Sequence, residues 1–213
     1  IAVVSGGLSV PSSTRNLADQ LAAEIRRQLG EDGRDAAVET IELRPLAHDL
    51  ADHLLTGFGS PALDAAIETV ASADALVAVT PIFAASYSGL FKTFFDVLEP
   101  ELLAGKPVLM AATAGTARHS LVLEHALRPL FSYLKATPVP TGVFAATEDF
   151  GDVNARLAER VERATAELVA LLGGTGPRAT RRLRAVAEEY DDPTPFADVL
   201  AALNSSDPGG PFG

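Results

Sequence analysis

Residues 5–25 read SGGLSVPSSTRNLADQLAAEI, and they join an apolar run to an amphipathic helix. The apolar run, IAVVS at residues 1–5, has the composition of a buried strand. The helix that follows carries one apolar stripe: Leu17, Leu21, Ile25 and Leu29. A strand that passes through a loop rich in serine into a helix is the unit from which parallel α/β sheets are built.

The rest of the chain repeats this unit. Strand-like runs occupy residues 1–5, 37–42, 75–80, 107–113 and 139–145, and helical patterns occupy residues 14–29, 61–72, 88–98, 119–135 and 152–172. The alternation predicts a parallel sheet with helices on both faces and right-handed crossovers. Five strands in a chain of this length favour the strand order 2-1-3-4-5. Residues 43–60 do not fit the alternation, and we expect an inserted short helix and loop there.

Residues 1–174 are predicted to form this one domain, and residues 175–213 a C-terminal extension. Four arginines lie within residues 178–184, whereas residues 185–213 contain six acids and no basic residue. The last stretch, NSSDPGGPFG, is rich in turn residues, so we expect the extension to be partly mobile.

The composition excludes several classes of function. The chain has 213 residues, of which 47% are hydrophobic, so it can bury a sizeable core. It contains no cysteine, which excludes disulfides and thiol catalysis. Its formal net charge of -11 argues against binding to nucleic acid or to an anionic membrane surface. Neither a membrane span nor the basic start of a secretion signal is visible, so we expect a cytoplasmic protein.

The predicted strand order brings the loops after strands one, three and four to one crevice, where open parallel sheets bind ligands. In the first loop, hydroxyl side chains surround a helix start, which presents unpaired N–H groups and the positive end of a dipole: Ser9, Ser12, Ser13 and Thr14. Such a loop can hold a phosphate without a lysine. Neither a Walker loop nor a G-x-G-x-x-G pattern is present, so a terminal monophosphate suits it better than a pyrophosphate. The alternative is that Ser12 or Ser13 only caps the helix.

The second loop, TPIFAASYSG, predicts a surface for a flat ring. It starts with an apolar ledge, which consists of Pro81, Ile82 and Phe83. It continues with small residues that let main-chain N–H groups come close to a ligand: Ala84, Ala85 and Ser86. A large heteroaromatic ring with hydrogen-bonding edges would suit this surface. The alternative is an ordinary strand-to-helix turn with Phe83 in the core.

The loops resemble those of the NADPH-dependent FMN reductase family, which has a flavodoxin-like fold. The resemblance covers about residues 1–172 and is most specific in TPIFAASYSGLFKTFFD. That stretch matches the family pattern P-x-Y-x-x-S-x-x-G-x-L-K at Pro81, Ser86, Gly89 and Lys92. It departs from the pattern at two positions, where apolar side chains are kept: Phe83 at the tyrosine and Phe91 at the leucine.

The first loop departs further from the family pattern. The family has G-S-x-R, whereas this chain has Gly7 at the serine and Ser9 at the arginine. Ser12 matches a later serine, and Thr14 replaces an asparagine. Without this arginine, the loop lacks one of the family's contacts to the phosphate. Arg15 is the candidate to replace that contact.

The resemblance implies an α/β, flavodoxin-like three-layer fold with a five-stranded parallel sheet in the order 2-1-3-4-5. It also implies an NAD(P)H:FMN oxidoreductase, most similar to the branch that supplies reduced FMN to flavin-dependent monooxygenases and associates as a homodimer or homotetramer. The FMN phosphate would then lie at Ser9, Ser12, Ser13 and Thr14. The ring would lie on residues 81–86, closed on its other side by Ala114, Gly115 and Thr116. NADPH or NADH would supply the hydride, so no catalytic acid or base is expected.

Arg118 and His119 flank the expected crevice and are candidates for contact with the nicotinamide nucleotide, with exposed surface residues as the alternative. The stretch HDLADH, residues 48–53, pairs histidine with aspartate at a spacing of four residues. A solvated helix is favoured there over a metal site, because no suitable third ligand is near.

Three other functions stay open at this point. An electron-carrier flavodoxin-like protein fits the acidic charge, but the chain has no tryptophan to sandwich a flavin ring. A quinone or azo-dye reductase would have the same fold. A flavin-free regulatory or interaction domain is the third alternative.

Overall fold

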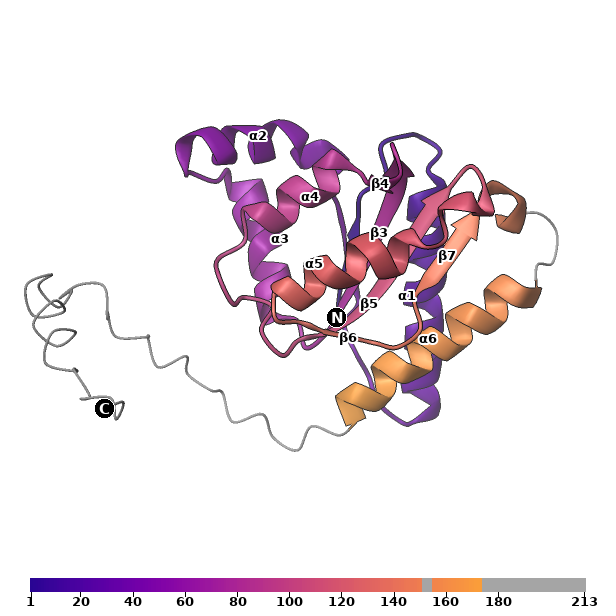
Figure 1. Cartoon of the computed structure of the whole chain (residues 1–213). Helices are drawn as coiled ribbons and strands as arrows, with labels where there is room; N and C mark the ends of the chain where they lie inside the picture. The colour runs from indigo at the N-terminus through magenta and orange to yellow at the C-terminus, as the bar shows by residue number, and fades with distance from the viewer. Residues whose placement is uncertain (151–154, 174–213) are drawn as a thin grey trace, which may run out of the picture. The chain divides into compact units, whose positions relative to one another are not determined.

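A parallel sheet lies at the centre of the structure, a computed structural model that describes residues 1–150 and 155–173 (Figure 1). Its parallel strands are β1 (Ala2–Ser5), β2 (Glu39–Glu42), β3 (Leu76–Phe83), β5 (Pro107–Ala114), β6 (Thr137–Pro138) and β7 (Val143–Ala146). They lie in the order β2-β1-β3-β5-β6, and β7 also pairs with β5. The flavodoxin-like arrangement is thereby confirmed, and the predicted strands follow one another in the expected order. The sheet has seven strands rather than the predicted five, because the short strand β4 (Ser86–Tyr87) pairs with β3 and the predicted last strand is replaced by β6 and β7.

The predicted fifth strand needs a correction. Residues 139–145 do not form one strand, because residues 139–142 separate β6 from β7. Pro138 and Pro140 flank the start of this gap, and a proline has no N–H to donate to a ladder. The edge of the sheet is therefore built from two short pieces.

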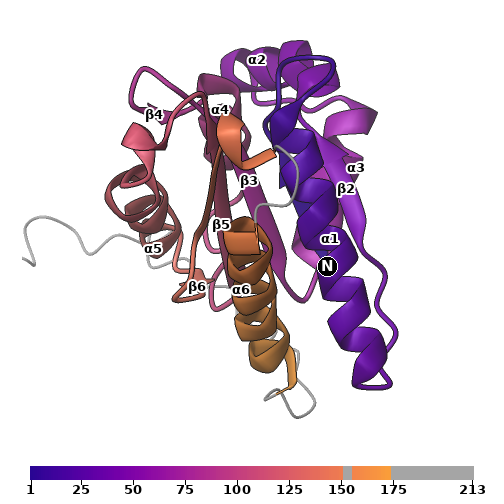
Figure 2. The same ribbon diagram turned by 90° about the vertical axis from the view of Figure 1, so that its right-hand side faces the viewer.

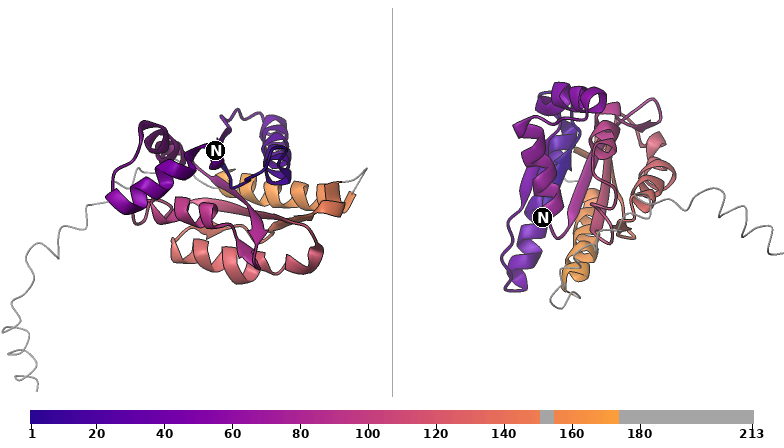
Figure 3. Two further views of the ribbon diagram at one scale, coloured as in Figure 1. Left: turned by 90° about the horizontal axis from the view of Figure 1, so that it is seen from above. Right: turned by 90° about the vertical axis from the view of Figure 1, so that its left-hand side faces the viewer.

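Helices cover both faces of the sheet, as Figure 2 shows. On one face lie α1 (Ser13–Glu31) and α6 (Ala155–Gly173), and on the other lie α3 (Pro61–Ser72), α4 (Gly89–Asp96) and α5 (Arg128–Tyr133). Successive residues of β3 point to opposite faces, so Val77 packs with α1 and α6 while Ala78 packs with the other core. In the view from above, the sheet separates α6 from α5 (Figure 3).

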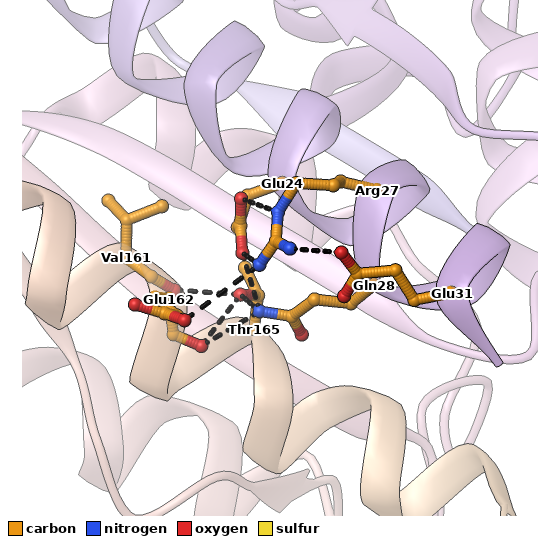
Figure 4. A network of polar contacts seen from close by, with 7 residues as sticks. All are labelled: Glu24, Arg27, Gln28, Glu31, Val161, Glu162 and Thr165. Atoms are coloured by element: carbon orange, nitrogen blue, oxygen red, sulfur yellow. Dashed lines mark hydrogen bonds and ion pairs between the residues drawn. The ribbon is translucent and has the colours of Figure 1, made fainter.

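A polar network joins α1 to α6 (Figure 4). It consists of Glu24, Arg27, Gln28, Glu31, Val161, Glu162 and Thr165. The Gln28 amide donates to Thr165 Oγ1 over 2.8 Å and to the Glu162 carbonyl over 3.0 Å. The fully buried Thr165 donates in turn to the Val161 carbonyl over 2.8 Å. Because an unpaired buried partner would lose its hydration without compensation, this network fixes α6 against α1.

An aromatic cluster joins α4 to α5 on the opposite face. Phe91 and Phe95 of α4 have ring centroids 4.8 Å apart, and Phe131 of α5 meets Phe95 edge-on at 5.1 Å. Phe94 also meets Phe95 edge-on, at 5.4 Å. The edge-on contacts have the geometry that aromatic pairs prefer, so the cluster adds to the burial of each ring.

The inserted segment has the predicted form. Residues 43–60 contain the short turn η1 (Arg44–Leu46) and the helix α2 (Ala47–Thr56). The helix ends at Gly57, whose φ of 76° places it in the left-handed region that glycine adopts readily. The predicted helix 61–72 matches α3, with Ser60 as its cap and Pro61 as its first residue.

The prediction of a continuous helix over 119–135 is wrong. The segment divides into η2 (Ala117–His119), a π-helical turn η3 (Leu123–Leu127) and α5. Pro129 lies just after η3; it cannot donate a hydrogen bond, and its ring would clash with the carbonyl four residues earlier in an α-helix. A wider turn before the proline avoids that clash.

Two sequence-based expectations concern residues outside the described ranges. The start of the predicted helix 152–172 and the whole extension 175–213 lie there. Within residues 1–150 and 155–173, no helix is long and apolar enough to cross a membrane.

We predict that Phe131→Ala destabilises the fold by about 3–5 kcal/mol, because it empties a fully buried ring site between α4 and α5. Tyr133, on the same helix, is 85% exposed and provides the matched control Tyr133→Ala. Urea unfolding followed by circular dichroism measures both. Equal losses from the two variants would show that the cluster adds nothing beyond helix propensity.

Candidate functional site

A cleft of about 330 Å³ opens at the carboxyl ends of β1, β3 and β5. Its lining comes from each of the three loops that the sequence singled out: Leu8, Ser9, Ser13, Thr14, Pro81, Ile82, Phe83, Thr113, Ala114, Gly115 and, from a fourth loop, Thr147. The volume lies in the range of small-molecule sites. The lining residues carry no charged side chain, so binding must rely on hydroxyls, backbone groups and apolar contact.

The hydroxyls at the start of α1 divide into different roles. Ser12 is the N-cap, and its Oγ accepts a hydrogen bond from the Arg15 N–H at 3.2 Å. Thr14 is only 2% exposed, and its Oγ1 lies 2.8 Å from Thr113 Oγ1 on β5. Ser13 is exposed and lines the cleft. The capping alternative therefore describes Ser12, whereas Ser9 and Ser13 are exposed and line the cleft.

Gly7 makes room for this cap. A Cβ built at Gly7 would lie 2.2 Å from Ser12 Oγ and 3.3 Å from Thr14 Cβ. Any side chain at position 7 would thus displace the capping hydroxyl. The glycine that departs from the family pattern is explained by where the Ser12 side chain lies.

Arg15 does not replace the missing arginine of the first loop. Its Nε donates to Asp19 Oδ1 over 2.8 Å, and its Nη1 pairs with Glu42 Oε1. The hydrogen bond to Asp19, helped by the Glu42 carboxylate, raises the pKa of the Arg15 guanidinium. Arg15 lines a separate hollow of about 340 Å³ beside these two acids. Its charge is already compensated and is not aimed at the cleft.

The second loop is a β-hairpin, so the alternative of an ordinary strand-to-helix turn does not hold. β3 continues to Phe83 and pairs antiparallel with β4 (Ser86–Tyr87), with Phe83 opposite Ser86. Ala84 and Ala85 form the two-residue turn with φ values of 47° and 66°. Two-residue hairpin turns of this kind require positive φ at both positions, which costs an alanine about 1–2 kcal/mol. The strained turn lies beside the cleft, where unusual backbone is often part of a site.

Hydrogen bonds hold the base of this hairpin. The buried Thr80 hydroxyl donates to the Pro81 carbonyl over 2.9 Å and accepts from the Ser88 N–H at 3.1 Å. Ser88 in turn caps α4 by accepting from the Phe91 N–H at 3.2 Å. The hairpin is therefore fixed to both the sheet and the next helix.

Of the residues predicted to form the ring surface in the second and third loops, only some line the cleft. Pro81, Ile82 and Phe83 line the cleft, and Phe83 is 51% exposed, so it is not a core residue. Ala84, Ala85 and Ser86 do not line the cleft, and two of them, Ala85 and Ser86, line a neighbouring hollow instead. In the third loop Ala114 and Gly115 line the cleft and Thr116 does not.

Two lining residues were missed by reasoning from the sequence. Thr113 was assigned to a strand, and Thr147 begins the short turn η4 (Thr147–Phe150) after β7. The strand order itself could have indicated Thr147, because the end of the last strand lies beside the end of its neighbour β5.

Arg118 and His119 lie in a neighbouring hollow of about 380 Å³. Ala85 and Ser86 of the hairpin form its opposite wall, and His125 of η3 also lines it. A larger hollow, about 590 Å³, lies around Ile1 and Asp74, at the amino ends of β1 and β3, and is remote from the predicted loops. Among the residues that the structure describes, no three histidine or acidic side chains gather as a metal site.

Comparisons with known proteins agree with this geometry. The profile of the NADPH-dependent FMN reductase family matches residues 1–151. An FMN reductase (NADPH) from Pseudomonas aeruginosa is 39% identical over 82% of this chain and 92% of its own length.

Solved structures have the same fold. An oxidoreductase from Corynebacterium diphtheriae superposes with a TM-score of 0.79 at 48% identity, over 82% of this chain and 97% of that one. The apo form of an NADH:FMN oxidoreductase superposes with a TM-score of 0.72 at 30% identity, over 84% of this chain and 92% of that one. The match over residues 1–151 and the 39% identity to a named FMN reductase, together with the shared fold, show that the chain belongs to the NADPH-dependent FMN reductase family.

Proposed function

We propose that this chain reduces FMN with NADPH or NADH. The observation that carries the proposal is the uncharged cleft at the carboxyl ends of β1, β3 and β5, with a helix start at one end and the Phe83 ledge along it. The chain's relatives named as FMN reductases support the same activity. When bound, the flavin supplies the redox chemistry by accepting a hydride.

The residues of the cleft fit FMN in three places. The exposed hydroxyls of Ser9 and Ser13, with the free N–H groups that begin α1, would hold the phosphate. Ser12 and Thr14 would act indirectly, by capping the helix and tying it to Thr113. Pro81, Ile82 and Phe83 would carry the ring, and Ala114 and Gly115 would close its other side.

The protein itself would then bind the flavin and orient it for hydride transfer. The hairpin, held by Thr80 and Ser88, keeps the ledge in place. The walls of the cleft would shield the bound ring from water on the sides that they cover. Reduced FMN would pass to a partner flavin-dependent monooxygenase, as the resemblance to the supplying branch implies.

The activity is tested by the loss of nicotinamide absorbance with catalytic amounts of protein and excess FMN. We expect oxidation of NADPH or NADH in proportion to the protein, with a turnover in the ordinary enzyme range of about 1–10³ per second. Absence of any rate above the protein-free control, in a protein that binds FMN, would refute the enzymatic function.

The phosphate assignment predicts a preference for FMN over riboflavin. Removing both exposed hydroxyls, in Ser9→Ala combined with Ser13→Ala, should weaken FMN binding about 10²- to 10⁴-fold and leave riboflavin binding nearly unchanged. The reason is that hydrogen bonds to a charged group contribute about 1.5–3 kcal/mol each.

Fluorescence titration with the two flavins measures this effect. Ser60→Ala is the matched control, because Ser60 caps α3 by accepting from the Leu63 N–H at 3.1 Å and lies on a different loop. If the double variant lost the same affinity for both flavins, the serines would serve only the local fold.

The protein should also associate as a homodimer or homotetramer. The end of α2 and the loop after it expose two large apolar side chains: Leu55, at 85%, and Phe58, at 81%. Leu55→Glu combined with Phe58→Ser should lower the mass measured by light scattering to that of a monomer, because the apolar contact is lost. Tyr133→Glu, an equally exposed site on α5, should leave the mass unchanged. A monomeric native protein would contradict this expectation.

A further inference from the structure

The strand order sets the direction in which a flavin would lie across the sheet. The proposed ring surface belongs to the ends of β3 and β5, and the proposed phosphate site belongs to the loop between β1 and α1. In the order β2-β1-β3-β5, strand β2 lies on the side of β1 that is away from β3. A group attached to the far side of the phosphate would therefore extend towards the end of β2.

The hollow of about 340 Å³ around Arg15 lies at that place. It shares Ser9 with the cleft, so the two spaces adjoin at the phosphate loop. Glu42, which also lines it, is the last residue of β2 and pairs in register with Ser5, the last residue of β1. A ligand that continued beyond the phosphate would thus reach this hollow.

The hollow carries more negative than positive charge. Among the described residues that line it, Arg15 is the single basic side chain, and Asp19 and Glu42 are both acids. Arg15 Nε donates to Asp19 Oδ1 over 2.8 Å, and Arg15 Nη1 pairs with Glu42 Oε1. The side chains of Asp19 and Glu42 are 53% and 50% exposed, so an anion entering from solvent meets the carboxylates themselves. One positive charge is opposed by two negative ones, and a phosphate placed here would be repelled.

Two common flavin nucleotides differ at this end of the molecule. FMN and FAD have the same ring, the same ribityl chain and the same first phosphate, so the cleft by itself does not distinguish them. FAD continues with a second phosphate and an adenosine. With the first phosphate at Ser9, Ser13 and the start of α1, the second phosphate would lie where the cleft passes into the hollow.

We propose that Asp19 and Glu42 are specificity-determining residues, which exclude FAD from the site by repelling its second phosphate. The assignment rests on the proposed function for the position of the flavin. The two acids act directly through their charge, and they also act by holding Arg15, whose guanidinium would otherwise suit a phosphate. FMN ends at its first phosphate and stays clear of both carboxylates.

Calorimetric titration with FMN and with FAD, without any reductant, tests this exclusion. The native protein should bind FMN at least about tenfold more tightly than FAD. Asp19→Asn combined with Glu42→Gln should raise the affinity for FAD at least about tenfold, because the repulsion is removed and Arg15 is released. The affinity for FMN should change less, so the ratio of the two affinities should fall.

Two further variants separate charge from folding. Arg15→Ala leaves both carboxylates without their counter-charge, so it should weaken FAD more than FMN and raise the ratio. A loop that was merely loosened would lose affinity for both flavins alike. Glu31→Gln is the matched control, because Glu31 pairs with Arg27 Nη1 over 2.6 Å at the far end of the same helix. It removes one negative charge and should leave both affinities unchanged.

The outcomes that overturn the assignment differ from those that overturn the proposed function. A native protein that binds FAD as tightly as FMN, or an unchanged ratio in the variant lacking both acids, would show that the hollow does not select the flavin. Binding of neither flavin would overturn the assignment together with the flavin site. FMN that binds but is not reduced by NADPH or NADH refutes the reductase activity alone, and the titration still decides whether Asp19 and Glu42 exclude FAD.

Discussion

Parallel pairing of β3 with β1 on one side and with β5 on the other is the constraint on which the rest of the structure depends. Val77 lies opposite Val3 and Leu109 in these ladders, and nearly all of β3 is buried on both faces. Because the three strands run in one direction, their carboxyl ends reach the same edge of the sheet. The loops after them must meet there, and no side-chain interaction is needed to bring them together.

The start of α1 shows how one short loop serves both stability and binding. Ser12 satisfies a backbone N–H of the helix, and Thr14 ties the helix to Thr113 of the sheet. Gly7 leaves the space that the Ser12 side chain occupies. With these tasks assigned to neighbours, Ser13 is left exposed at the cleft. Ser12 and Thr14 thus use their hydroxyls within the fold, whereas the hydroxyl of the exposed Ser13 is available to a ligand.

Charge is distributed unevenly around the site. The protein as a whole is acidic, and a negative field opposes the approach of phosphate-bearing ligands. Near the first loop, Asp19 and Glu42 compensate Arg15, so that hollow gains little positive character. The cleft itself is lined by no charged side chain, and Arg118 lines a neighbouring hollow beside the hairpin. At the cleft, the dipole of α1 and the hydroxyl groups would therefore stabilise a bound phosphate, which a lysine side chain does in other phosphate sites.

The sequence by itself determined the layers, the strand order and the three loops of the cleft, because buried runs and helical stripes such as Leu17 to Leu29 are local patterns. It also identified Ser13, Pro81 and Gly115 as lining residues. Only the tertiary structure decided that Thr14 contacts Thr113 and that Arg15 pairs with Glu42. It also decided that the turn at residues 84 and 85 has positive φ values and does not line the cleft. Each of these depends on a partner distant in the chain or on the geometry of a turn. Sequence patterns between near neighbours predict helices and strands, but they do not specify such distant partners or the exact geometry of a turn.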